Sequence, residues 1–180
     1  MEAQTLDMLA SLGWAVFPLP PGGRVPERGW QRAVTLAPDP AQFPAGSNLG
    51  IGCRASRVVV LDLDMPDGVA SLELLCTQYR QELPPTFTVS TPSGGEHRYF
   101  RVGEECTIGS GSSVLRPGID VRGPGLTQGG YVVGPGSVVD GKPYTAAAAP
   151  VAPLPRWLDF LLVSTMRTLI VSGPDAMYGD

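Results

Sequence analysis

Two aspartates, one residue apart, end a β-branched run, Val58-Val59-Val60-Leu61-Asp62-Leu63-Asp64. Such a run predicts a buried strand, and a strand directs alternate side chains to one face. Asp62 and Asp64 would then point the same way, while Leu61 and Leu63 point into a core. Two carboxylates in one small volume raise each other's proton affinity unless a cation lies between them, so the pair suits a divalent metal ion. The alternative is a strand end that exposes two solvated acids.

The only histidine follows a glycine-rich turn, Ser93-Gly94-Gly95-Glu96-His97. Gly94 and Gly95 would let the backbone approach a ligand closely, and turn amides beside a hydroxyl and an imidazole suit phosphate binding. A lone histidine is more often structural or solvated, so His97 alone decides nothing.

A third acid, Asp120, lies in Gly118-Ile119-Asp120-Val121-Arg122-Gly123. The same alternation puts Asp120 and Arg122 on one face. A carboxylate for metal beside a guanidinium for phosphate suits a site for a metal-bound triphosphate. The alternative is an ordinary surface ion pair on a strand.

Two other motifs are weaker. Gly109-Ser110-Gly111 starts like a dinucleotide fingerprint, but the third glycine and the following helix are missing. The run ending in Asp62 also resembles the first motif of haloacid dehalogenase-like phosphatases, in which that aspartate is the nucleophile. Those enzymes need a later lysine and an acidic pair, and the only lysine, Lys142, has no such pair after it.

Hydrophobic periodicity predicts the elements that carry these residues. Leu6, Leu9 and Leu12 predict a helix over 3–12, and a strand over 14–17 is expected to end at Pro18. A loop over 18–30, rich in proline and glycine, carries Arg24. The remaining predictions are strands at 49–52, 57–63, 86–90, 98–102, 119–121 and 130–134, a helix capped by Asp67 that runs to Leu83, and a helix from Arg156 to about Val171.

Composition limits the class of protein. The chain has 180 residues, of which 43% are hydrophobic and 17% charged, as in a globular domain. The three cysteines and one histidine cannot form a zinc site, and they fit a reduced, cytoplasmic setting. There is no secretory signal and no apolar stretch long enough to span a membrane. A net charge of −4 argues against a broad basic surface that grips duplex DNA.

The order of the motifs resembles the archaeo-eukaryotic primase superfamily, and most closely its bifunctional primase/polymerase (Prim-Pol) N-terminal domains from plasmid, phage and prophage replication. The resemblance covers about residues 10–160. Its motifs are Gly13-Trp14-Ala15-Val16-Phe17-Pro18-Leu19, Gly29-Trp30-Gln31, Asn48-Leu49-Gly50-Ile51-Gly52, Val60-Leu61-Asp62-Leu63-Asp64, Thr91-Pro92-Ser93-Gly94-Gly95-Glu96-His97-Arg98-Tyr99-Phe100, Gly118-Ile119-Asp120-Val121-Arg122-Gly123 and Gly129-Gly130-Tyr131-Val132-Val133-Gly134-Pro135-Gly136-Ser137.

This resemblance implies an α/β (α+β) fold: a primase-polymerase catalytic core with an RNA-recognition-type sheet and a small packed α/β unit. It implies that Asp62, Asp64 and Asp120 bind two Mg²⁺ or Mn²⁺ ions, and that His97 is catalytic with them. His97 and Ser93, with Gly94 and Gly95, match the motif that holds the phosphates of the incoming nucleotide. Arg122 is added to these from its place beside Asp120.

The expected activity is DNA primase/polymerase, a nucleotidyltransferase that makes primers from nucleoside triphosphates on a single-stranded DNA template. We expect the Prim-Pol domain to span residues 1–165 and a helix end and tail to span 166–180. No helicase module follows residue 165, so a helicase would come from a separate polypeptide if the chain is complete. Two departures from relatives are Arg24, where lysine is common, and extra residues at 124–128. A catalytically silent module that binds nucleotide or single-stranded DNA stays open, as does, less favourably, the phosphatase.

Overall fold

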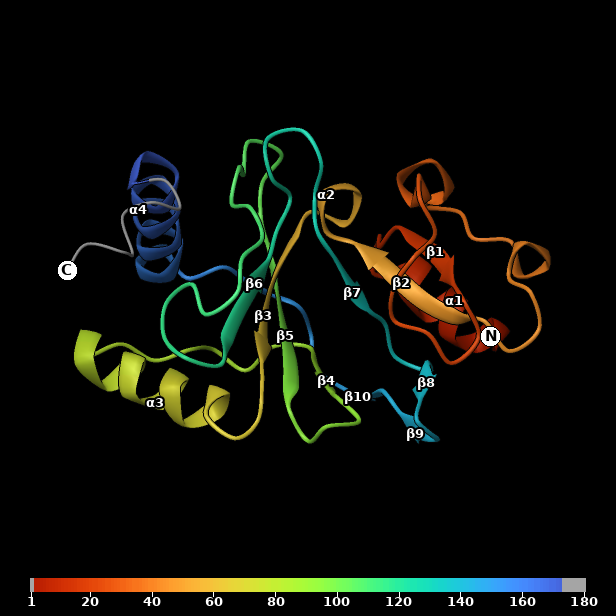
Figure 1. Ribbon diagram of the computed structural model, residues 1–180, viewed down its shortest axis with the longest axis horizontal. Coiled ribbons are helices and arrows are strands. Elements are labelled where there is room, and N and C mark those ends of the chain that lie inside the picture. Colours follow the sequence, from red (N-terminus) through yellow and green to blue (C-terminus); the bar gives the residue numbers. More distant parts are fainter. Residues whose placement is uncertain (1, 173–180) are drawn as a thin grey trace.

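The structure, a computed structural model, describes residues 2–172. Its two main sheets lie side by side (Figure 1), and a further sheet has only two short strands. The larger sheet has the strand order β10-β4-β5-β3-β6, and all of these neighbours are antiparallel. A short strand, β11, pairs parallel with β5. The bounds are β3 Val58–Leu63, β4 Thr88–Ser90, β5 Glu96–Arg101, β6 Ile119–Arg122, β10 Thr145–Ala147 and β11 Ala152–Pro153.

Two helices, α3 (Gly68–Tyr79) and α4 (Arg156–Ser172), cover one face of the larger sheet (Figure 1). The alternation of β3 explains this face, because Val59, Leu61 and Leu63 are fully buried in one cluster with side chains of both helices. Val58 and Val60 point to the opposite face and join the core under the smaller sheet. The helices α3 and α4 therefore lie on the face of β3 that Asp62 does not share.

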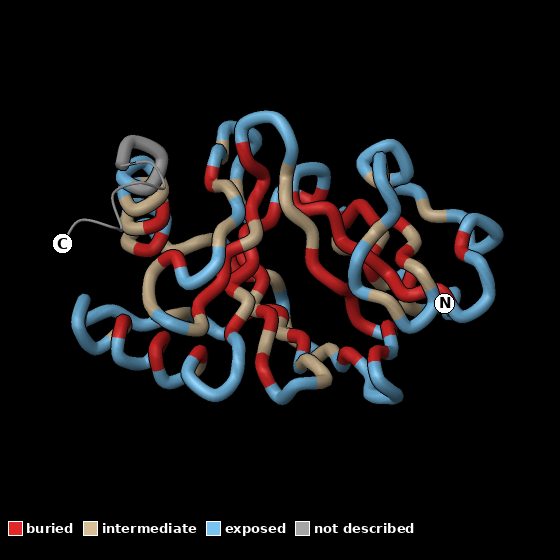
Figure 2. The backbone as a smooth tube through the Cα atoms, viewed as in Figure 1, coloured by how far each residue is buried: buried red, intermediate tan, exposed pale blue. Residues whose placement is uncertain are grey.

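The smaller sheet has the order β1-β2-β7, with β1 Val16–Leu19, β2 Asn48–Gly52 and β7 Tyr131–Val133. Trp14 joins the two sheets, since its ring stacks on Tyr99 at a centroid distance of 4.7 Å and meets Phe87 edge-on at 5.0 Å. Buried residues run continuously between the sheets (Figure 2). The other elements here are α1 Ala3–Ser11, η1 Trp30–Ala33, η2 Pro40–Gln42, α2 Cys53–Ser56, β8 Val138–Val139 and β9 Lys142–Pro143.

The mixed α/β class is confirmed, but several predicted boundaries differ from the structure, and two of the differences have a clear physical reason. Pro18 lies inside β1 and pairs with Leu49. Val16 exchanges both backbone hydrogen bonds with Thr35, on the side away from β2, so Pro18 two residues later also turns its nitrogen away from β2. An edge strand tolerates proline in that orientation.

The second wrong boundary is the end of α3, which stops at Tyr79 rather than near Leu83. Arg80 adopts a left-handed conformation with φ of 51°, and the amide of Gln81 donates to the carbonyl of Cys76. These are features of a helix C-terminus. Leu83 is partly buried against the core beyond the helix, which explains why its spacing looked helical.

The predicted domain boundary at residue 165 falls inside α4, and residues 173–180 of the predicted tail lie outside the described residues. Within 2–172, no helix is long and apolar enough to cross a membrane.

Candidate active site

Three predicted site residues form one row across neighbouring strands. Asp62 on β3 pairs in register with His97 on β5 and with Asp120 on β6. Residues directly opposite each other in a sheet share a face, so the three side chains project from the same face of the larger sheet. The row lies toward the Leu63 end of β3, beyond the apolar pair Val58 and Val60 on the same face.

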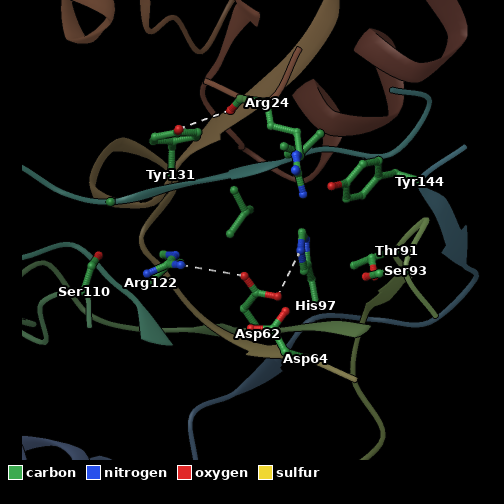
Figure 3. Close-up of a pocket in the computed structure, with 13 residues that line it drawn as sticks. Arg24, Asp62, Asp64, Thr91, Ser93, His97, Ser110, Arg122, Tyr131 and Tyr144 are labelled. Atoms are coloured by element: carbon green, nitrogen blue, oxygen red, sulfur yellow. Dashed lines mark hydrogen bonds and ion pairs between the residues drawn. The ribbon is translucent and has the colours of Figure 1, made fainter. Parts of the chain in front are cut away.

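A pocket of about 390 Å³ lies between the two sheets at this row (Figure 3). From the larger sheet and the residues that follow its strands come Asp62, Asp64, His97 and Arg122. From the opposite side come Arg24, Tyr131 and Tyr144; the residues that complete the lining are Thr91, Ser93, Ser110, Gly130, Val132 and Val133. The pocket thus combines two acids, a histidine and Arg122 on one side with Arg24 and two phenols on the other.

Asp62 is the centre of the charged contacts. Its Oδ1 lies 3.3 Å from Nε2 of His97, and its Oδ2 lies 4.0 Å from Nη2 of Arg122 (Figure 3). His97 is only 4% exposed, and its other nitrogen, Nδ1, is buried without a hydrogen-bond partner among the described residues. Asp62 therefore orients the imidazole, which borders the pocket from a buried position.

Asp64 follows β3 and is exposed at the pocket. Its amide donates to the carbonyl of Gly118, which fixes the chain just after the strand. Partial burial, followed by the negative charges of Asp62 and Asp120, raises the pKa of Asp64, while Arg122 and His97 oppose this rise. A cation bound beside Asp64 would offset the negative charges of its neighbours.

Asp120 is 8% exposed and does not border the pocket. Its Oδ1 accepts the amide of Ser113 at 2.8 Å, and its Oδ2 accepts both the hydroxyl of Ser112 at 2.9 Å and Nη2 of Arg122 at 3.0 Å. The structure brings Asp120 into the row, but its carboxylate already has partners in the loop before β6.

The turn over residues 91–95 places two hydroxyls at the pocket. The Thr91 and Ser93 hydroxyl oxygens lie 2.9 Å apart, and both residues line the pocket. Gly94 has a φ of 90°, which favours glycine, and a Cβ on Gly95 would clash with the carbonyl oxygen of Leu63. The two glycines are thus explained by the shape of the turn and its packing on β3, and neither lines the pocket.

Comparison with known families identifies the chain. The family model of the bifunctional DNA primase/polymerase N-terminal domain (Prim-Pol) matches residues 5–157. This chain belongs to the Prim-Pol family. The match spans both sheets and every residue that lines the pocket. No curated protein gives a significant match.

The Prim-Pol pocket offers a partial seat for a divalent ion. Within residues 2–172, no three His, Cys, Asp or Glu side chains are grouped closely enough to hold a metal ion as they stand. Mg²⁺ is often bound by only one or two carboxylates together with substrate phosphates. Asp62 and Asp64 supply two carboxylates at the pocket, and after partial burial the negative charges of Asp62 and Asp120 contribute to the raised pKa of Asp64. This donor set fits a hard divalent cation that also has phosphate ligands.

Among the lining residues of the Prim-Pol pocket that sequence reasoning left out of the site are Arg24, Tyr131 and Tyr144. The Tyr131 hydroxyl donates to the carbonyl of Arg24 at 3.2 Å, which ties β7 to the loop after β1. Burial raises the pKa of both phenols, so they stay protonated near neutral pH and can donate hydrogen bonds. The one available signal was Arg24, a basic residue in a loop rich in proline and glycine.

Proposed function

We propose that this Prim-Pol domain joins nucleotides on a single-stranded DNA template by two-metal nucleotidyl transfer, in the replication of a plasmid, phage or prophage. The observation that carries the proposal is the row of His97, Asp62 and Asp120 beside Asp64 at a pocket between two sheets. Acids alone would suit many metal enzymes. Arginines and hydroxyls at the same pocket add the donors that a triphosphate requires.

Each side chain of the pocket has its own role in this proposal. Asp62 and Asp64 would hold divalent ions, Mg²⁺ or Mn²⁺, with Asp120 as a third ligand. When bound, the ions would supply activation of a 3′-hydroxyl and neutralisation of the triphosphate. Arg122, Ser93 and His97 would hold and orient the phosphates, and His97 is itself oriented by Asp62. Correct positioning and fixed charge account for most of the rate gain in such reactions.

A catalytically silent module that binds nucleotide or single-stranded DNA is the second candidate. The observation in its favour is that Asp120 is already engaged by Ser112, Ser113 and Arg122. Metal ligation by Asp120 would require it to give up some of these partners. A module of this kind would bind nucleotide in the same pocket and would extend nothing.

A primer-synthesis assay separates the two candidates. Labelled nucleotides, a single-stranded template and Mn²⁺ or Mg²⁺ are incubated with the wild type, with Asp62→Asn and with Asp67→Asn. Asp67 is an exposed acid at the start of α3 whose side chain makes no capping hydrogen bond, so it controls for the loss of one charge.

We expect synthesis by the wild type and the control, and a loss of about 100-fold or more in Asp62→Asn, because the variant weakens the hold on the divalent ions that would neutralise the reacting phosphates. Near-normal synthesis by Asp62→Asn would refute the role given to Asp62. Retention of nucleotide by the wild type without any extension would instead identify the silent module.

A further inference from the structure

A second and larger pocket, of about 710 Å³, lies beside the candidate active site. Its walls come from η1 and the residues after it, from α2, and from the segment before β7. Three arginines line it, Arg32, Arg54 and Arg57, and its lining residues include no acid. In a chain with a net charge of −4, three arginines without an acid form a local positive groove.

One wall of this arginine groove includes the end of the segment 124–128. Nη1 of Arg54 donates to the carbonyls of Gly125 at 2.8 Å and Leu126 at 3.0 Å, which anchors the segment on α2. Thr127 and Gln128 then line the groove. The segment 124–128 therefore supplies part of the groove wall and is held there by Arg54.

The other two arginines are available to a ligand. Arg32 and Arg57 are exposed. Arg57 forms an ion pair with Glu104, and both side chains are more than half exposed. An exposed pair of this kind is worth about 0–1 kcal/mol, so a phosphate can replace Glu104 at low cost.

The groove and the candidate active site share a border. Gly130 lines both pockets, and a Cβ at this position would clash with the hydroxyl of Ser110. Trp30 lines the groove and meets Tyr131 of the active-site pocket at a centroid distance of 5.1 Å. An extended ligand can therefore cross from one pocket to the other over bare backbone, with aromatic rings beside it.

We propose that the arginine groove binds the single-stranded DNA template that leads to the active-site pocket. This inference rests on the proposed function, because a template must lie beside the nucleotide that it selects. Proteins that bind single strands usually combine basic side chains that contact the phosphates with an aromatic ring on which a base can stack. The lack of acids in the lining favours a polyanion over a cationic or neutral partner.

The test measures binding of a fluorescein-labelled oligothymidine of about 20 nucleotides, long enough to cover one binding site, by fluorescence anisotropy over a range of salt concentrations. The full chain is compared with Arg32→Gln, Arg57→Gln and the double variant. Arg54 is left intact because it holds the segment 124–128. Arg80→Gln is the matched control: Arg80 is exposed, has a φ of 51° against 52° for Arg57, and ends α3 on the opposite face of the larger sheet.

Each lost phosphate contact should reduce the slope of log K against log salt by about 0.7, so the double variant should lose about 1.4. Its KM for template should rise in primer synthesis, while its KM for nucleotide stays at the wild-type value. An unchanged slope in the double variant, or an equal loss in Arg80→Gln, would overturn the groove assignment even if primers are made. If the salt slope depends on Arg32 and Arg57 but the protein makes no primers, the result would support DNA binding in the groove and refute the proposed catalysis.

Discussion

Replacing Asp64 with asparagine should stabilise the folded protein while it removes a proposed metal ligand. Asp62 and Asp64 are two residues apart in extended chain, or about 6.6 Å at about 3.3 Å per residue. Two unit charges at that distance repel each other by about 0.6 kcal/mol in a water-like medium. Because Asp64 is exposed, the water-like value applies. The gain corresponds to a rise in Tm of about 1 to 2 °C for a chain of this length.

The stability gained by Asp64→Asn should increase as the pH rises from acid to neutral. The pKa of Asp64 is raised in the folded protein, chiefly by partial burial and then by the charges of Asp62 and Asp120. An acid with a raised pKa weakens folding once it ionises, so wild-type stability falls as the pH rises through the folded pKa. Below the ordinary value of 3.8, Asp64 is protonated in both states, and the asparagine variant should then have no advantage from charge.

Thermal denaturation from acid to neutral pH, at low salt and without metal, measures this effect against Asp67→Asn. Addition of Mg²⁺ should then raise the Tm of the wild type by mass action and raise that of Asp64→Asn less. A Tm for Asp64→Asn that is equal to or below that of Asp67→Asn at neutral pH would refute the repulsion argument. An equal rise with Mg²⁺ in both proteins would refute the role of Asp64 in binding the ion.

Two further predictions concern packing. Gly95→Ala should cost about 1 to 3 kcal/mol of stability in urea denaturation, because its Cβ would overlap the carbonyl oxygen of Leu63; an unchanged midpoint would show that the turn can move away from β3. Cys53 should stay unlabelled by a thiol reagent in the folded protein while Cys76 and Cys106 react, because Cys53 is fully buried and burial raises its pKa to about 12. Equal labelling rates for all three cysteines would contradict the placement of Cys53 in the core.

The sequence predicted the parts of the site that depend on local periodicity. The β-branched run put Asp62 on the face opposite to Leu61 and Leu63, and the structure has that alternation. Family resemblance ordered His97 and Asp120 with Asp62 in one site, and the strand register places them in one row. Period-2 patterns can be read from sequence because they need no knowledge of distant contacts.

The rest depends on long-range packing. Tyr131 on β7 reaches the pocket because the smaller sheet lies over the larger one, and Tyr144 reaches it from the connection between β9 and β10. No local pattern marks either phenol as part of a site. The end of α3 was misjudged because Leu83 keeps an apolar spacing after Arg80 has turned the chain. Pro18 was expected to end its strand because proline is not tolerated in central strands, whereas β1 is an edge strand.

Arg122 reconciles the engaged state of Asp120 with a metal-binding role. Its Nη2 lies 3.0 Å from Oδ2 of Asp120 and 4.0 Å from Oδ2 of Asp62, so without a bound ion it offsets part of the negative charge of both acids. A triphosphate offers Arg122 a more highly charged, bidentate partner. Once Arg122 turns to phosphate, Oδ2 of Asp62 and Oδ2 of Asp120 both lose their guanidinium, although the Asp120 oxygen keeps the Ser112 hydroxyl. Each oxygen then has room to bind a cation that arrives with the nucleotide. We therefore expect ion and nucleotide to bind together at this pocket, each more weakly in the absence of the other.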